Sequence, residues 1–263
     1  MDLGLSGRVA VVGGASSGLG RASATRLAQE GCDLLVWARR EDAIRAFAAD
    51  LASRTGRRVE PLSADAADPE AAALVAERAL DAFNHVDVVI LNSGGPPATE
   101  PTTTTPDQFR AAFQLLAVTP IDLANRLLPG MRERAWGRIV AILSWGVREP
   151  VPGIVLSNAG RTALAAWMKT TSRVVAKDGV TINGVLPGRF STPRIASLDS
   201  TRSEREGRPV EQVQAEARSV IPAARDGDPD ELGALVAFLA SAPAAYVTGT
   251  FTPVDGGMLL SLG

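Results

Sequence analysis

The chain has 263 residues, 46% of them hydrophobic and 21% charged, with a formal net charge of −2 at pH 7. This length and composition indicate a globular protein with a sizeable core, and the slightly acidic balance excludes a surface built to bind nucleic-acid phosphates. The sequence has neither a run of about 20 apolar residues nor a secretory leader pattern, so it predicts a cytoplasmic protein without a membrane partner.

Short apolar segments alternate with longer helical patterns along the whole chain. Strands are predicted at residues 8–12, 33–37, 59–63, 86–91, 137–143, 180–186 and 250–254. Helices are predicted up to Glu30, over 42–55, and from Pro69, Pro106, Val155 and Pro229. Because the strands are apolar on both faces, this alternation is typical of an α/β fold, a doubly wound parallel sheet (Rossmann fold) of seven strands with helices on both faces. No repeat or linker divides residues 1–263, which we interpret as a single domain.

Prolines add detail to this fold prediction. Pro61 lies inside the third predicted strand, and its missing N–H predicts a position at an edge of the sheet. Pro120 lies inside the helical pattern that starts at Pro106, and it predicts a bend in a continuing helix.

The polar segment 194–222 lies between the sixth predicted strand and the last helix. Its composition and place suit a substrate lid over a pocket, and equally a solvated insertion without a function. We predict the lid.

A glycine-rich segment, GGASSGLG, follows the first predicted strand and precedes a helix. Its glycines permit a tight turn and a close approach of the backbone to a pyrophosphate, while the helix N-terminus supplies N–H groups. This segment therefore predicts a dinucleotide site. The predicted contacts here are Gly14, Ser16, Ser17, Gly18, Leu19 and Gly20.

The end of the second predicted strand indicates which dinucleotide is bound. Arg39 and Arg40 stand there, and no carboxylate occurs before Glu41. Since arginine pairs well with phosphate oxygens, the sequence favours NADP(H) over NAD(H), although both arginines also suit a solvated helix entry. Asp65, just past the third strand, is predicted either to accept a hydrogen bond from the adenine amino group or to cap a turn.

These motifs resemble the short-chain dehydrogenase/reductase family, and especially its members similar to 3-oxoacyl-(acyl-carrier-protein) reductase. GGASSGLG is similar to the family's TGxxxGxG loop, LNSGG at 91–95 resembles its Asn-Asn-Ala-Gly turn, and YVTGTFTPVDGG resembles its C-terminal signature. GRIVAILS puts Ser144 on the family's catalytic serine, and NGVLPGRFST puts Asn183 on the segment that closes over the nicotinamide. The resemblance implies further cofactor contacts at Asn92, Gly94, Pro187, Gly188 and Thr192.

The sequence departs from this family at the catalytic tyrosine and lysine. Thirteen residues after Ser144, the place of the tyrosine holds Ser157, and the place of the lysine four residues later holds Arg161. The family's catalytic asparagine falls on Leu116, and the one tyrosine, Tyr246, lies in the C-terminal signature. We thus predict an atypical Ser/Ser/Arg site.

The resemblance implies an NADP(H)-dependent oxidoreductase that reduces a carbonyl, or oxidises an alcohol, on a small substrate. In our hypothesis Ser144 donates to the substrate oxygen, Ser157 and a water replace the tyrosine, and Arg161 stabilises negative charge. Glu149 is a second candidate for the proton donor. A hydrophobic substrate is favoured by the apolar residues Trp145, Val147, Val151 and Ile154.

Other interpretations stay open at this point. Ser157 and Asn158 suit helix caps, Arg161 suits a surface or interface cation, and Leu116 suits a core position. The chain would then be a nucleotide-binding regulatory subunit, or a non-redox enzyme such as a cyclase, isomerase or dehydratase. The resemblance also implies a homodimer or homotetramer.

Two residues that occur only once have structural interpretations. Cys32 lies in the apolar run CDLLVW and is predicted to be a core residue. His85 is predicted to be structural, and no cluster of ligands predicts a metal site.

Overall fold

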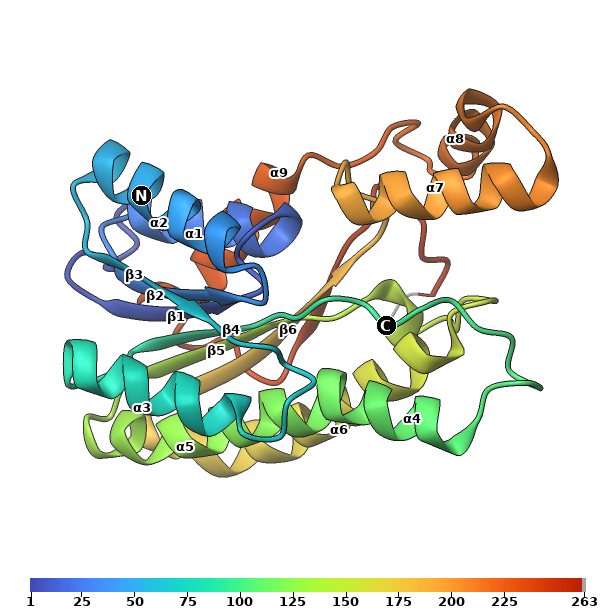
Figure 1. Cartoon of the computed structure of the whole chain (residues 1–263). Helices are drawn as coiled ribbons and strands as arrows, with labels where there is room; N and C mark the ends of the chain where they lie inside the picture. The colour runs from blue at the N-terminus through green and yellow to red at the C-terminus, as the bar shows by residue number, and fades with distance from the viewer. Residues whose placement is uncertain (262–263) are drawn as a thin grey trace.

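The computed structural model describes residues 1–261, which form one seven-stranded parallel sheet between two layers of helices (Figure 1). The strands are β1 (Val9–Gly13), β2 (Asp33–Ala38), β3 (Val59–Ser63), β4 (Val88–Leu91), β5 (Gly137–Ile142), β6 (Val180–Pro187) and β7 (Phe251–Val254). Their order is β3-β2-β1-β4-β5-β6-β7. The seven predicted strands and the doubly wound fold are therefore confirmed.

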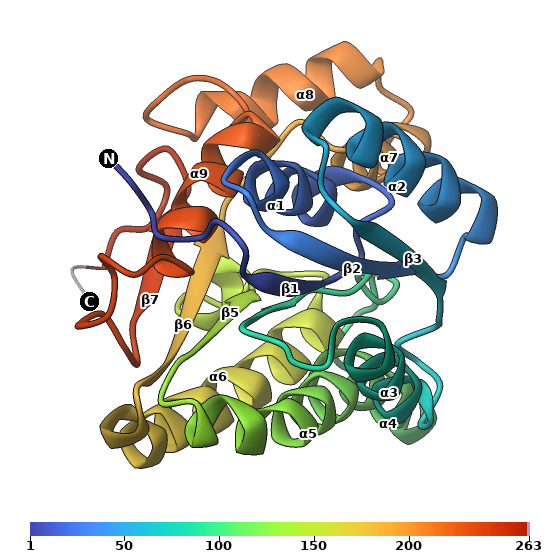
Figure 2. The same cartoon turned by 90° about the vertical axis from the view of Figure 1, so that its left-hand side faces the viewer.

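Helices cover both faces of the sheet, as Figures 1 and 2 show. One face carries α1 (Gly18–Gln29), α2 (Glu41–Thr55) and α9 (Pro229–Leu239). The other carries α3 (Ala71–Phe83), α4 (Pro106–Phe113), α5 (Thr119–Glu133) and α6 (Val155–Val175). The strand order reverses between β1 and β4, the point at which folds of this type bind ligands beyond the carboxyl ends of the strands.

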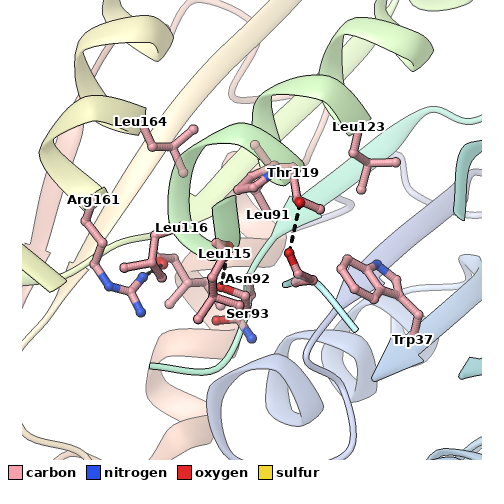
Figure 3. Close-up of a pocket in the computed structure, with 13 residues that line it drawn as sticks. Trp37, Leu91, Asn92, Ser93, Leu115, Leu116, Thr119, Leu123, Arg161 and Leu164 are labelled. Atoms are coloured by element: carbon pink, nitrogen blue, oxygen red, sulfur yellow. Dashed lines mark hydrogen bonds between the residues drawn. The ribbon is translucent and has the colours of Figure 1, made fainter. Parts of the chain in front are cut away.

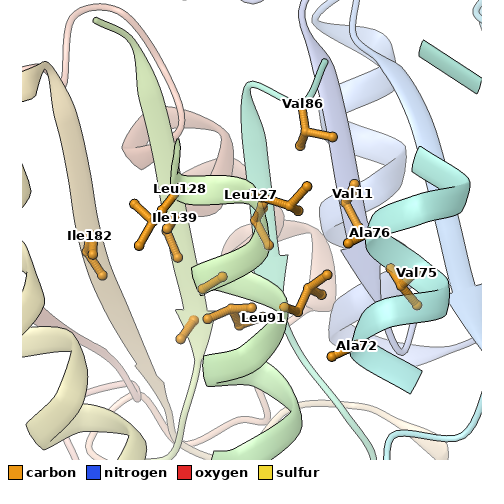
Figure 4. Packing of buried hydrophobic residues seen from close by; sticks show 14 of the residues in the cluster. Val11, Ala72, Val75, Ala76, Val86, Leu91, Leu127, Leu128, Ile139 and Ile182 are labelled. Atoms are coloured by element: carbon orange, nitrogen blue, oxygen red, sulfur yellow. The ribbon is translucent and has the colours of Figure 1, made fainter. Parts of the chain in front are cut away.

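The apolar side chains of the strands pack on both sides of the sheet and form two cores. Val11 and Ile139 face α3 and α5 on one side, where Val75 and Leu127 meet them (Figure 4). The other core is built around β1, β2, α1 and α9 and contains Cys32, whose burial raises the pKa of its thiol to about 12. Cys32 is therefore a core residue, as predicted.

Two predictions from proline have the expected outcomes. β3 is an edge strand, so the missing N–H of Pro61 removes a donor where few partners exist. The helix from Pro106 passes through a π-helical turn at Gln114–Val118, in which the Thr119 N–H donates to the Gln114 carbonyl, and continues as α5. Pro120 has no N–H to offer the Leu116 carbonyl four residues earlier, which explains why the α-helical pattern fails here.

One helix start differs from its prediction. The helix predicted from Pro69 begins at Ala71, and its N-cap is Glu70. The carboxylate of Asp68 accepts a hydrogen bond from the Glu70 N–H at 3.0 Å and so closes a turn before the helix.

Segment 194–222 contains two packed helices, α7 (Pro193–Glu206) and α8 (Val210–Ser219). A buried ion-pair network fixes them to the end of β6. Arg189 donates hydrogen bonds to Asp199 in α7 at 2.9 and 2.5 Å and to Asp226 at 2.7 Å, and Arg218 at the end of α8 donates to Asp226 at 2.9 Å.

This network predicts an acid-sensitive contribution to stability. Burial raises the pKa of Asp226, but hydrogen bonds from Arg218 and Arg189 outweigh it, so the folded-state pKa lies below the ordinary value of an aspartate. A carboxyl whose pKa is depressed by folding stabilises the protein above its unfolded pKa of about 4, and that stabilisation is lost as pH falls through the folded pKa. We expect the Tm difference between the wild type and Asp226→Asn to be largest above pH 5 and to shrink toward pH 3. Parallel Tm curves for the two proteins across this range would contradict the assignment.

Candidate functional site

The glycine-rich loop lies between β1 and α1, and its backbone is tightly packed. A Cβ at Gly20 would stand 2.5 Å from the Gly14 carbonyl oxygen and 2.7 Å from that of Gly13. Asn92, just past β4, donates from Nδ2 to the Gly13 carbonyl at 3.1 Å and so holds the loop against the sheet. Close packing of this kind leaves the outer side of the loop free for a ligand.

The N-terminus of α1 suits a pyrophosphate. Its N-cap is Ser17, whose side chain makes no capping hydrogen bond, and no acidic residue stands in the first turn. The N–H groups of this turn therefore have no side-chain acceptor, and the helix dipole favours an anion here. Leu19 and Gly18 belong to the same turn, and the methyl group of Thr192 would lie 3.3 Å from a Cβ at Gly18.

The two predicted phosphate-binding arginines directly follow β2, and one of them contacts this loop. Arg40 donates from its guanidinium to Ser16 Oγ at 3.3 Å. Arg39 lies 4.0 Å from the Asp65 carboxylate, and both side chains line an open pocket next to β3. Asp65 accepts a hydrogen bond from the Ala67 N–H at 3.0 Å, so it does cap a turn. Its contact with adenine stays a prediction.

The segment after β6 reaches the same side of the sheet. Thr192 is the N-cap of α7, where its Oγ accepts from the Ile195 N–H at 3.4 Å. Gly188 has no room for a side chain, because its Cβ would stand 2.8 Å from Asp255. Pro187 ends β6 directly before it.

Asn183 does not belong to this segment. It is fully buried in β6, donates from Nδ2 to the Val247 carbonyl at 2.7 Å and accepts from the Thr250 N–H at 3.2 Å. It therefore ties β6 to the chain before β7, and its placement over the nicotinamide was wrong.

The three predicted catalytic side chains come from β5 and α6. Ser144 follows β5 and opens a short 3₁₀ turn, where its Oγ accepts from the Gly146 N–H at 3.1 Å. Ser157 and Arg161 lie one turn apart on α6, and Arg161 Nε donates to Ser157 Oγ at 3.3 Å. Arg161 Nη1 donates to the Ile142 carbonyl at 2.7 Å, which fixes the guanidinium to the end of β5, two residues before Ser144.

These contacts contradict the helix-cap and surface-cation alternatives for this stretch. α6 begins at Val155 with Ile154 as its N-cap, so neither Ser157 nor Asn158 caps the helix. Asn158 instead donates from Nδ2 to the Val151 carbonyl at 2.9 Å and braces the preceding loop. Arg161 is no surface cation, because it lines a pocket at the carboxyl ends of the strands (Figure 3).

Arg161 carries its positive charge without an ion-pair partner among residues 1–261. Burial and, to a smaller extent, the charge of Arg194 lower the pKa of Arg161 to about 10. The guanidinium thus stays protonated at neutral pH. Two of its N–H groups are used by Ser157 and Ile142, which leaves three for a ligand.

The pocket runs from Arg161 to Trp37, which lie at opposite ends of it in Figure 3. Leu116, from the π-helical turn, lies between them and is almost fully buried. The cavity volume is about 20 Å³, enough for one water molecule. Asn92 and Ser93 add polar groups to the lining.

Some predicted residues lie outside this pocket. Trp145, Val147, Val151 and Ile154 do not line it, so the structure adds nothing to the argument for a hydrophobic substrate. Glu149 accepts from the Leu260 and Ser261 N–H groups at 3.1 and 3.3 Å. Its carboxylate holds the C-terminal segment, which argues against Glu149 as the proton donor.

Sequence reasoning missed Arg194, in the first turn of α7. Its Nη2 donates to the Pro96 carbonyl at 2.7 Å, across 98 positions of the chain. No local motif predicts a contact with Pro96. The one signal in the sequence is the place of Arg194, two residues after Thr192.

No group of three metal-ligating side chains exists within residues 1–261, and His85 pairs with the buried Asp87 at 3.3 Å. Across the same residues, none of the helices combines the length and apolar character that a membrane span requires.

Known proteins resemble this chain over almost its whole length. Residues 14–259 match the family described as enoyl-(acyl carrier protein) reductase. The chain is 30% identical to D-beta-hydroxybutyrate dehydrogenase of Cupriavidus necator over 260 residues, covering 96% of this chain and 98% of the relative. It is also 30% identical to the NADPH-dependent reductase BacG of Bacillus subtilis over 260 residues, covering 98% and 100%.

A solved structure extends the likeness to three dimensions. L-sorbose reductase from Gluconobacter frateurii, complexed with NADPH and L-sorbose, is 31% identical with a TM-score of 0.95, and the match covers 100% of both chains. NADPH in these relatives agrees with the NADP(H) predicted from Arg39 and Arg40. The glycine loop, the sheet order and these matches show that the chain belongs to the short-chain dehydrogenase/reductase family of oxidoreductases.

Proposed function

We propose that this protein is an NADP(H)-dependent reductase of a small carbonyl compound, with Ser144, Ser157 and Arg161 as its catalytic residues. The observation that carries the proposal is the position of Arg161, held by Ser157 and the Ile142 carbonyl with three N–H groups left for a ligand. Reduction of a carbonyl builds negative charge on its oxygen, and a fixed cation at that place stabilises the transition state.

The two serines have complementary roles in this proposal. Ser144 Oγ accepts from Gly146, and Ser157 Oγ accepts from Arg161, so the O–H of each hydroxyl is free to donate. Ser144 donates to the substrate oxygen, while Ser157 orients a water that delivers the proton. The cavity that Arg161 helps to line has room for one water molecule, but neither serine is among its lining residues.

This assignment puts Ser157 and Arg161 in the places where the family has its tyrosine and lysine. A serine hydroxyl is a weaker acid than a phenol, and an arginine is a poor proton donor at neutral pH. The proton must therefore come from water, and Arg161 acts by its charge.

The cofactor proposed is NADP(H), which supplies the hydride when bound. The uncapped N-terminus of α1 fits its pyrophosphate, and Arg40 with Ser16 fits its 2′-phosphate. The NADPH complex of L-sorbose reductase and the NADPH dependence of BacG support the same cofactor.

Two measurements test the proposal together. Titration calorimetry on nucleotide-free protein is expected to show tight NADPH binding, and NADPH absorbance is expected to fall in the presence of a suitable carbonyl compound. Absence of NADPH binding would overturn the proposal.

Arg40→Ala is expected to weaken NADPH binding about 10- to 100-fold, because the variant loses a charged hydrogen-bond donor to the 2′-phosphate. NADH, which lacks that phosphate, is expected to change by less than about threefold. The matched control is Arg45→Ala. Arg45 is an exposed arginine on α2 that pairs with Glu41, one turn before it. Equal losses for both cofactors would contradict the assignment of Arg40.

A non-redox reaction is the second candidate, and the observation that favours it is the lack of an acidic group beside Arg161 among the described residues. In that case Arg161 and Ser144 bind an anionic or enolic intermediate. Product formation without NADPH consumption distinguishes this reaction from reduction. The cytoplasmic location, the homo-oligomer, the hydrophobic substrate and the lid role of residues 194–222 stay predictions.

A further inference from the structure

Asn158, near the start of α6, holds the loop that follows Ser144. Its Nδ2 donates to the Val151 carbonyl at 2.9 Å, seven positions earlier in the chain. Its other amide atom, Oδ1, is buried and has no hydrogen-bond donor within residues 1–261. A buried amide oxygen without a donor costs stability, because nothing replaces the water that it loses on folding. The gain from an asparagine here is therefore sought in the site and not in the stability of the fold.

The same amide oxygen fills the space that a side chain at position 146 would need. A Cβ at Gly146 would stand 2.6 Å from Asn158 Oδ1. It would also stand 3.3 Å from Ser144 Oγ and 3.4 Å from Val151 Cγ2. Gly146 lies in a 3₁₀ turn and its φ is not positive, so other residues could adopt its backbone conformation. The lack of space beside Asn158 is thus what requires glycine at this position.

Gly146 in turn holds the hydroxyl of Ser144. Its N–H donates to Ser144 Oγ at 3.1 Å, and the Val147 N–H donates to the Ser144 carbonyl at 3.1 Å. A serine side chain has three staggered rotamers, and the hydrogen bond from Gly146 favours one of them. Because this bond uses one lone pair of Oγ, the direction left for the O–H depends on where Gly146 lies.

The other side-chain contacts of this loop are made further along the chain from Ser144. Arg148 donates from Nη2 to the Phe251 carbonyl at 2.8 Å, and Glu149 accepts from the C-terminal segment. These two contacts fix the far end of the loop to β7 and to the chain after it. The end next to Ser144 is packed against Asn158.

We propose that Asn158 is a positioning residue for Ser144: its amide holds Gly146 in place, and Gly146 aims the Ser144 hydroxyl at the substrate oxygen. This inference rests on the proposed function, in which Ser144 donates to that oxygen. Asn158 acts through Ser144, so it sets the rate of reduction more than the affinity for the substrate. A displacement of about 1 Å in a catalytic group is enough to lower a rate about 100-fold.

The first test is a double-mutant cycle between Asn158 and Ser144. Asn158→Ala is expected to lower kcat about 10-fold and to leave KM within about twofold, since a misaimed hydroxyl weakens the transition state more than binding. In a Ser144→Ala background, the same substitution is expected to change kcat by less than about twofold, because no hydroxyl remains to be aimed. A merely structural role predicts the same loss in both backgrounds, and that result would overturn the inference.

The matched control for this cycle is Asn125→Ala. Asn125 is an exposed asparagine on α5, and its removal is expected to leave kcat and KM as in the wild type.

A second test does not depend on turnover. Amide hydrogen exchange at Gly146, followed by NMR, reports how firmly its N–H is bound to Ser144 Oγ. Asn158→Ala is expected to speed this exchange about 10-fold, while the amides of β5 exchange as in the wild type. Unchanged exchange at Gly146 would overturn the inference, whatever the activity of the variant.

A third test restores the space. Gly146→Ala is expected to lower kcat, because its methyl group would meet Asn158 Oδ1 at 2.6 Å. Adding Asn158→Ala removes that oxygen, so the double variant is expected to be more active than Gly146→Ala alone. A double variant that is as slow as the product of the two single losses would contradict the contact as the cause.

The inference and the proposed function can fail separately. Wild-type turnover in Ser144→Ala would contradict the proposed function, whereas faster exchange at Gly146 in Asn158→Ala would still support the hold of Asn158 on the turn. Loss of activity in Ser144→Ala, together with unchanged exchange and turnover in Asn158→Ala, would support the proposed function and overturn the inference.

Discussion

Arg161→Ala is expected to lower kcat/KM for carbonyl reduction by about 100- to 1000-fold, the largest effect of any single change in the site. The variant loses the donors to Ser157 and to the Ile142 carbonyl, and with them the positive charge that, in the proposed mechanism, faces the developing alkoxide. Because charge stabilisation matters most in the transition state, the loss is expected mainly in kcat. The change in kcat and KM is measured by steady-state NADPH oxidation over a series of substrate concentrations that reaches saturation.

Two further variants make the Arg161 result interpretable. Arg161→Lys keeps a cation and is expected to recover part of the rate, although lysine lacks the planar fork that reaches two acceptors. Arg173→Ala, on the same helix, is expected to behave as the wild type. If Arg161→Ala turned over at the wild-type rate while remaining folded, the catalytic assignment would be wrong.

Arg189→Ala is expected to have the largest effect on stability. The substitution leaves Asp199 and Asp226 buried without the cation that both accept from, and their side chains are 6% and 7% exposed. Breaking a buried ion pair by removing one partner costs about 3–5 kcal/mol. At roughly 2–4 °C per kcal/mol for a domain of this size, the Tm is expected to fall by about 6–20 °C.

Thermal unfolding followed by circular dichroism checks this value against Arg54→Ala. Arg54 forms an exposed pair with Asp50 on α2, and such pairs contribute about 0–1 kcal/mol. The double variant Arg189→Ala, Asp199→Ala is expected to be less destabilised than the sum of its parts, since it no longer buries that unpaired carboxylate. If Arg189→Ala and Arg54→Ala lowered the Tm by similarly small amounts, the ion-pair network of Arg189 would contribute little to the stability of the fold.

The parts of the fold that were predictable from the sequence are those set by local rules. Strand positions followed from short apolar segments, and the place of Pro61 at an edge followed from a missing donor. That the helix continues past Pro120 was also predictable, but the π-helical turn was not, because several arrangements satisfy the freed carbonyl. The start of α3 was misplaced, since Asp68 closes a turn instead of capping the helix.

The site divides in the same way. The glycine loop and the pair Ser157 and Arg161 are local patterns. The loop glycines pack closely, and Arg161 contacts Ser157, as their spacing in the sequence predicts. Asn183 was misassigned, because a motif position says nothing about the partners that a buried amide finds on another strand. Arg194 was missed for the related reason that its partner carbonyl lies far away in the sequence.

Both edges of the sheet end in a strand that contains a proline. Pro61 lies within β3. Pro253 lies within β7, the four-residue strand at the other edge. An edge strand without a full row of N–H donors is a poor template for another chain, so strand-by-strand growth into aggregates is disfavoured at each rim. Copies of this protein that associate are therefore expected to meet through helices, and the two edges of the sheet can face solvent without templating fibres.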